Sequence, residues 1–153
     1  MKFTRHIWLL IILTVPIYLI GTSSLAAAGQ ASLAKVYTAA ETASMSEKWG
    51  IQVTSIHTAA AGNMVDFRYK VLDARKAASL FDKKTKPYLI HEKSGKVLAV
   101  PRTAKVGPLM SSYHPKENRI YWMFFGNQAK LVKPGDRVTV VIGDFKVANL
   151  KVD

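Results

Sequence analysis

The sequence predicts an all-β protein, an antiparallel β-sandwich of about seven strands with one short helix, preceded by a hydrophobic segment. Apolar and polar residues alternate in short segments, most clearly in residues 64–71, where Val65, Phe67 and Tyr69 alternate with polar residues. Successive side chains of a strand point to opposite faces, so this pattern indicates a strand that is buried on one face. Turn-forming residues separate seven such segments within about 105 residues, a spacing typical of a sandwich.

The N-terminus has the features of an export signal. Two basic residues precede the apolar run of residues 7–20, which leads to the small-residue cluster at residues 26–28. This arrangement predicts a secretory signal peptide that is cleaved after Ala28. The alternative is a retained anchor, because residues 7–28 are long enough to cross a bilayer core of about 30 Å. Pro16 and the Ser, Thr and Ala content of the last third favour cleavage.

Both alternatives predict the same location for the rest of the chain. The basic residues before the apolar run stay in the cytoplasm, and no second span follows. The domain is therefore expected to be exported, either periplasmic or anchored to the inner membrane with its C-terminal part outside. Residues 29–48 are rich in Ala and Ser and poor in large apolar side chains, which predicts a spacer, either a mobile linker or a marginal helix. The folded domain is expected to cover residues 49–153.

The first predicted hairpin joins residues 49–58 to residues 64–71, with Gly62 and Asn63 in the turn. Asp73 follows the second strand and precedes a run of helix formers, an N-cap signal that predicts one or two helical turns over residues 73–82. This short helix is expected to carry the chain from one sheet to the other.

A second hairpin is predicted from residues 87–91 and 96–100, around the turn of residues 92–95. Residues 101–118 contain three prolines and one glycine and are expected to form a long loop. Long loops on a rigid scaffold often carry function, so Tyr113 and His114 at the loop tip are candidate binding residues.

The last three predicted strands are residues 119–125, 137–142 and 145–152. The first of them is apolar on both faces, which predicts a central strand. The segment LVKPGDRVTVVI, residues 131–142, resembles the turn and strand of exported bacterial immunoglobulin-like or fibronectin-III-like sandwich domains. This resemblance implies an immunoglobulin-like sandwich without implying a particular function. The cysteine pair of antibody domains is missing, because the chain has no cysteine.

The charge is the clearest functional signal. The chain carries a net charge of +12, which becomes +10 once residues 1–28, with two basic and no acidic residues, are removed. Residues 75–105 hold nine basic residues against Asp82 and Glu92 and are predicted to form one positive surface. These basic residues are Arg75, Lys76, Lys83, Lys84, Lys86, Lys93, Lys96, Arg102 and Lys105. Outside the inner membrane, such a surface fits an acidic protein partner or an anionic membrane or envelope surface.

Copper binding is the alternative function. Thioethers and imidazoles suit copper, and the candidate ligands are Met110, His114, His57 and His91. No H-x-H, M-x-M or M-x-x-M spacing occurs, so no metal or other cofactor is assigned from the sequence.

Catalysis and nucleic-acid binding are not expected. Ser111, Ser112 and His114 lie close together, but the G-x-S-x-G motif and an orienting carboxylate are absent from this loop. Aromatic and basic residues alternate only in residues 119–125, which are predicted to be core. The sequence therefore favours a non-catalytic envelope accessory or interaction module with a basic surface for an anionic partner.

Overall fold

The computed structural model describes residues 39–111 and 114–153. The predicted signal or anchor segment, residues 29–38 of the predicted spacer, and Tyr113 lie outside the described residues. No helix in the described part of the chain is long and apolar enough to cross a membrane.

The elements are one α-helix, short strands and three 3-10 turns. The helical segments are α2 (Ala39–Trp49), η1 (Ala60–Gly62), η2 (Lys76–Phe81) and η3 (Gln128–Lys130). The strands are β1 (Ile51–Ala59), β2 (Met64–Val71), β3 (Tyr88–His91), β4 (Val97–Ala99), β5 (Arg102–Thr103), β6 (Gly107–Pro108), β7 (Ile120–Gly126), β8 (Arg137–Ile142) and β9 (Phe145–Lys151).

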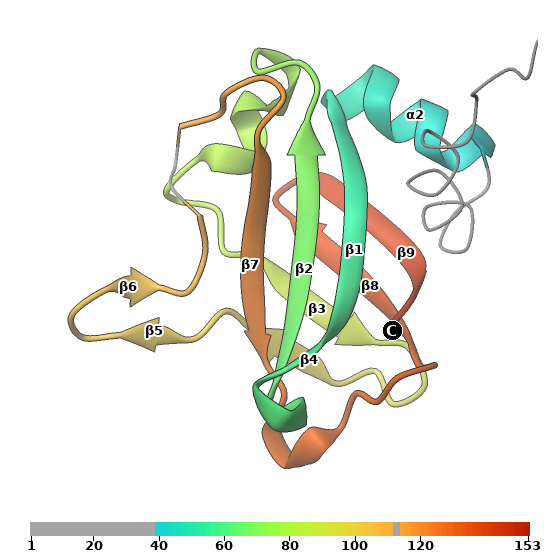
Figure 1. The fold of residues 1–153 in the computed structure, drawn as a ribbon, viewed down its shortest axis with the longest axis vertical. Coiled ribbons are helices and arrows are strands. Elements are labelled where there is room, and N and C mark those ends of the chain that lie inside the picture. Colours follow the sequence, from blue (N-terminus) through green and yellow to red (C-terminus); the bar gives the residue numbers. More distant parts are fainter. Residues whose placement is uncertain (1–38, 112–113) are drawn as a thin grey trace, which may run out of the picture.

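The strands form two antiparallel sheets that face each other, as Figure 1 shows. Sheet A has the order β1-β2-β7, and sheet B has the order β4-β3-β8-β9. The chain changes sheet after β2, between β4 and β7, and again after β7. Strands β5 and β6 form a small separate hairpin that projects to the side. The predicted all-β antiparallel architecture with one short helix is therefore confirmed.

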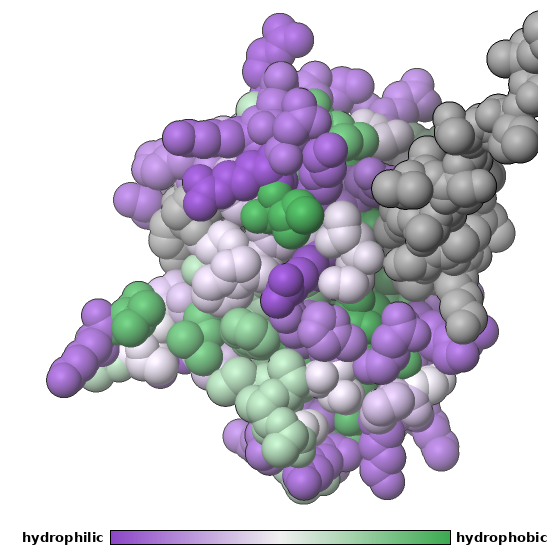
Figure 2. Space-filling view, in the orientation of Figure 1, coloured by the Kyte–Doolittle hydropathy of each residue, from purple (hydrophilic) through white to green (hydrophobic). Residues whose placement is uncertain are grey.

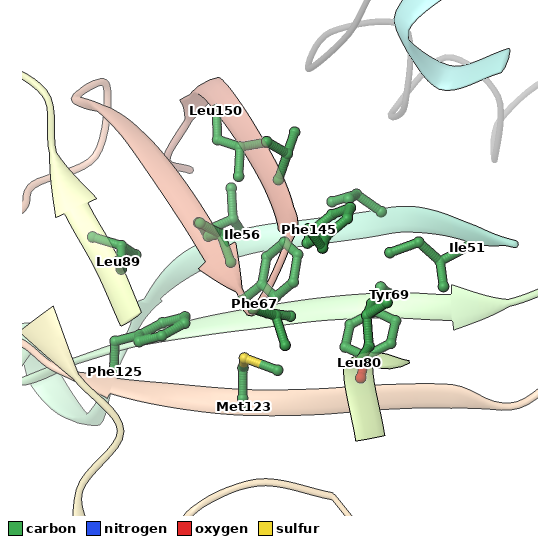
Figure 3. Packing of buried hydrophobic residues seen from close by; sticks show 14 of the residues in the cluster. Ile51, Ile56, Phe67, Tyr69, Leu80, Leu89, Met123, Phe125, Phe145 and Leu150 are labelled. Atoms are coloured by element: carbon green, nitrogen blue, oxygen red, sulfur yellow. The ribbon is translucent and has the colours of Figure 1, made fainter. Parts of the chain in front are cut away.

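The core lies between the two sheets. Phe67, Met123 and Phe125 of sheet A point toward Leu89 and Phe145 of sheet B (Figure 3), and all five are at most 1% exposed. Burial of an apolar side chain of this size stabilises a fold by about 1.5–3 kcal/mol. Because the chain has no disulfide, these apolar strand faces supply the main stabilisation of the sandwich.

Helix α2 occupies part of the predicted spacer and extends to Trp49, where a strand was expected to begin. Met45 of this helix is buried in the core. Gly50 ends the helix with a φ of 61°, and its N–H donates to the Ser46 carbonyl. A Cβ at Gly50 would lie 2.7 Å from the Asp73 carbonyl oxygen, so only glycine fits here.

The short helix expected over residues 73–82 is the 3-10 segment η2. As expected of a cap, the Asp73 carboxylate accepts hydrogen bonds from the backbone N–H groups of Arg75 at 2.9 Å and Lys76 at 3.2 Å. These bonds lower the pKa of Asp73 below its ordinary value. Ala77, Leu80 and Phe81 are buried and fix η2 on the core.

The two long seams between the sheets differ. On one side, the end of the chain joins sheet B to sheet A, because the Asp153 N–H donates to the Ile56 carbonyl and the Asp153 carbonyl accepts from the Thr58 N–H, at 3.0 and 3.1 Å. On the other side, β4 and β7 are the edge strands of their sheets and do not pair with each other. We call this unpaired side the open seam.

Strand β7 is an edge strand, so the expectation of a central strand at residues 119–125 was wrong. The returning loop covers its outer edge: the Phe124 N–H donates to the Leu109 carbonyl, and the Ser111 N–H donates to the Trp122 carbonyl. The outer face of β7, in contrast, is only partly covered, since Trp122 is 37% exposed.

Candidate anion-binding groove

The predicted basic stretch is spread over several parts of the molecule. Arg75 and Lys76 lie at the start of η2, and the Lys76 ammonium donates to the Glu47 carbonyl of α2 at 2.7 Å. Lys83, Lys84 and Lys86 lie in the connection from η2 to β3, Lys93 and Lys96 lie in the β3–β4 turn, and Arg102 and Lys105 lie in the β5–β6 hairpin. Hydrophilic side chains accordingly gather both at the η2 end of the molecule and on the projecting hairpin (Figure 2).

One groove brings part of this set together. We call it the basic groove; its volume is about 180 Å³. Lys83 and Lys86 line it from the η2–β3 connection, and Arg102 lines it from the base of the β5–β6 hairpin. The remaining lining residues are smaller or apolar: Thr85, Pro87, Ala99, Val100, Pro108 and Met110.

Local turns position both walls of the basic groove. The Asp82 carboxylate accepts from the Lys84 N–H at 2.9 Å, and the Asp82 carbonyl accepts from the Thr85 N–H at 3.0 Å. This turn presents the lysines to solvent before the buried Pro87 begins the approach to β3. On the other wall, Arg102 pairs with Pro108 across the hairpin.

The two acidic residues of the stretch do not line the basic groove, and their carboxylates accept other hydrogen bonds. The Asp82 carboxylate caps its own turn. The Glu92 carboxylate accepts hydrogen bonds from the Thr139 hydroxyl at 2.8 Å and from the Asn149 N–H at 2.7 Å, on the side of β8 and β9. No acidic residue lines the groove, and within the described residues Lys86 and Arg102 take part in no ion pair. The groove can therefore attract a negatively charged group.

A second, larger groove lies along the open seam, with a volume of about 550 Å³, and we call it the edge groove. Strand β4 and the residues that follow it form one wall, and Gly126 at the end of β7 with part of η3 forms the other. Its lining residues are Lys96, Val97, Leu98, Ala99, Val100, Pro101, Gly126, Gln128, Ala129 and Leu131. Ala99 and Val100 line both grooves, so the two grooves adjoin each other.

The candidate copper ligands have separate surroundings. The Nε2 atom of His57 on β1 lies 3.5 Å from the Asp66 carboxylate, and that of His91 on β3 lies 3.5 Å from the Asp136 carboxylate. The backbone of Met110 forms an isolated β-bridge with Met123 of β7, and the Met110 side chain packs against the core. No group of three or more His, Cys, Asp or Glu side chains that could hold a metal occurs within residues 39–111 and 114–153.

The loop of residues 101–118 is anchored by a residue that sequence reasoning missed. The hydroxyl of Tyr121, which is fully buried on β7, donates to the His114 carbonyl at 2.7 Å and accepts from the Lys116 N–H at 2.8 Å. His114 itself is exposed. A tyrosine in an otherwise apolar strand was a usable signal, because a buried hydroxyl requires a hydrogen-bond partner.

A buried carboxylate lies on the outer face of sheet A, where the sequence indicated only a polar face. Asp66 is 2% exposed and accepts two hydrogen bonds from the Arg68 guanidinium, at 2.8 and 3.0 Å. These bonds raise the pKa of Arg68 above its ordinary value. The cluster with His57 on β1 contains no nucleophile, and its buried carboxylate is explained by the ion pair of Asp66 with Arg68 along β2.

Comparison of this chain with known protein families, with curated proteins and with solved structures gave no match.

Proposed function

We propose that this protein is a non-catalytic, exported accessory or interaction module that binds an anionic partner through the basic groove. A single observation carries the proposal. Lys83, Lys86 and Arg102, from two separate segments, line one groove that has no acidic lining residue. Guanidinium and ammonium groups are suited to carboxylates and phosphates, and a concave cationic surface concentrates its field on such groups.

The sequence supports the proposed location and fold type of this module. The N-terminal export segment favours a site outside the cytoplasm, periplasmic or on the outer side of the inner membrane. A sandwich with three strands in one sheet and four in the other supports the immunoglobulin-like type implied by residues 131–142. Sandwiches of this type present loops at their ends, which suits a binding module.

The test uses the full chain and two probes. One is soluble polyglutamate, and the other is a vesicle that contains an anionic lipid. The triple variant Lys83→Glu, Lys86→Glu, Arg102→Glu changes the charge of the groove. The matched control Lys116→Glu, Lys146→Glu, Lys151→Glu makes the same change in net charge at exposed positions outside the groove.

We expect the wild type to bind at least one probe and to lose affinity steeply as salt rises from about 0.05 to about 0.5 M, because salt screens exposed charges. The groove variant should lose at least about tenfold in affinity, and the control variant should lose much less. Equal losses in both variants would show that net charge alone is responsible, and an absence of binding to both probes would overturn the proposal.

A further inference from the structure

Strand β4 has a free edge. It is the last strand of sheet B and pairs on one side only, with β3. The His91 N–H donates to the Lys96 carbonyl, which makes His91 and Lys96 a hydrogen-bonded pair. Pairs alternate in an antiparallel ladder, so Leu89 and Leu98 are the next hydrogen-bonded pair.

It follows that the backbone N–H and C=O groups of Val97 and Ala99 point away from β3. Within the described residues no other strand pairs with them. The end of β7 comes close at Ala99, whose carbonyl oxygen would lie 3.8 Å from a Cβ placed on Gly126, so Val97 is the more open of the two positions. Both residues are exposed, and Val97 retains 62% of its surface. An unpaired edge of this kind can accept an added strand.

The charges around this edge favour an added strand that is acidic. The edge groove runs along Val97 and Ala99, with Lys96 at one end of β4. At the other end it adjoins the basic groove with Lys83, Lys86 and Arg102. Neither groove has an acidic lining residue. A chain lying along β4 thus meets backbone hydrogen-bonding groups in the middle and cations at both ends.

We infer that the partner is an acidic polypeptide segment that binds in extended form as an additional strand on the edge of β4, with its carboxylates on Lys83, Lys86 and Arg102. This inference rests on the proposed function and specifies the partner class. The backbone of the segment pairs with Val97 and Ala99, while side chains on one of its faces enter the edge groove.

Two other occupants fit less well. A second copy of this chain would place its own Lys96 and Arg102 against the same cations, and like charges that face each other across strands are destabilising. A membrane surface would neutralise the cations but would leave the N–H and C=O groups of Val97 and Ala99 without partners in a recessed seam.

The experiment uses the wild-type full chain and a synthetic peptide with a short core of alternating Val and Thr between acidic ends. The matched control peptide has the same sequence with N-methyl groups on alternate core amides, which keeps the charge and removes the ability to pair as a strand. Affinities are measured by titration, and amide hydrogen exchange is followed at Val97 and Ala99. Polyglutamate and the groove variant are measured in parallel.

We expect the plain peptide to bind at least about tenfold more tightly than the N-methylated peptide and to slow exchange at Val97 and Ala99. Equal affinity of the two peptides, or unchanged exchange at both amides, would overturn the strand inference while leaving charge-dependent binding of polyglutamate, and with it the proposed function, intact. Loss of binding to every acidic probe would remove both. Protection of these amides in the free protein together with a dimeric mass would identify a second copy as the occupant and overturn the inference.

Discussion

The hydroxyl of Tyr121 donates a hydrogen bond to the carbonyl of His114, and the ring lies in the core against Phe81 at a centroid distance of 4.8 Å. One side chain thus joins the packing of β7 to the end of the long loop. The same hydroxyl accepts from the Lys116 N–H, so the loop is held at two backbone positions.

The variant Tyr121→Phe removes both hydrogen bonds and keeps the ring. We expect it to lower the free energy of unfolding by about 1–2 kcal/mol, because two backbone groups lose their partner while the exposed side of the loop can bind water. Urea unfolding measures this loss. The control Tyr88→Phe removes a hydroxyl from a ring that is 36% exposed and should change stability little. Equal effects of the two variants would contradict the anchoring role of Tyr121.

Tyr69 makes the stability of the protein depend on pH in the alkaline range. Burial raises the pKa of this phenol, and the neighbouring Tyr121 ring adds to the effect. Below the ordinary pKa of 10.0, the phenol is neutral in both the folded and the unfolded chain, and the stabilising effect is fully present. Above it, the unfolded chain releases the proton while the folded protein retains it, so stability falls as pH rises.

We expect the free energy of unfolding of the wild type to fall more steeply above pH 10.0 than that of Tyr69→Phe, with an excess slope of at most about 1.4 kcal/mol per pH unit. Urea unfolding of both proteins from neutral pH to about pH 11 measures the difference between their free energies of unfolding. The other tyrosines and the lysines titrate in both proteins, so their contribution cancels in this difference. Parallel curves for the two proteins would refute this account.

Gly50 is predicted to be the least replaceable glycine of the described residues. Gly50→Ala imposes a positive φ on alanine and also forces its Cβ against the Asp73 carbonyl oxygen. Gly95→Ala is the matched control, because Gly95 has a φ of 68° and nothing within 4 Å of an added Cβ. We expect a loss of about 1 kcal/mol at Gly95 and of about 3 kcal/mol or more at Gly50 in denaturant unfolding. Similar losses at both sites would show that the contact with Asp73 relaxes freely.

Asn127 is 1% exposed and holds the turn after β7 together. Its amide nitrogen donates to the carbonyls of Gly62 and Val132, and its amide oxygen accepts from the Val132 N–H, at 2.7–2.9 Å. Asn127→Ala leaves these buried groups without partners, so we expect a loss of about 2–4 kcal/mol. Asn63→Ala removes one exposed hydrogen bond to the Ala60 carbonyl and should cost less than about 0.5 kcal/mol. Thermal unfolding of both variants tests the contrast.

Much of the fold was predictable because strand periodicity reports burial directly. The alternation of Val65, Phe67 and Tyr69 placed β2 with the correct buried face, and the structure pairs it with β1 as the first hairpin. Strand β7 shows the limit of this reasoning. Its apolar run predicted cover on both faces and a strand on each side, but Ile120 and Trp122 on the outer face are 54% and 37% exposed. A loop, residues 109–111, takes the place of a neighbouring strand along one edge, and apolar periodicity does not distinguish the two.

The sequence left helix α2 as one of two alternatives for residues 29–48 and did not predict the β5–β6 hairpin, for different reasons. The helix has few large apolar residues, and its attachment depends on Met45 and on the turn at Gly50. The hairpin strands have two residues each, too short to show any period. Counting charge along the chain likewise found the basic stretch but gave no information on which loops meet, so the grouping of Lys83, Lys86 and Arg102 required the structure.

A strand added at the open seam, as proposed above, would couple binding to the stability of the whole domain. A ligand that binds only the folded state stabilises it by about 2.7 kcal/mol at a hundredfold excess over its Kd. A segment bridging β4 and the end of β7 would close the side of the sandwich where the described residues show no counterpart to the Asp153 bonds. The melting temperature of the protein is therefore itself a reporter, and candidate partners can be ranked by how far each one raises it.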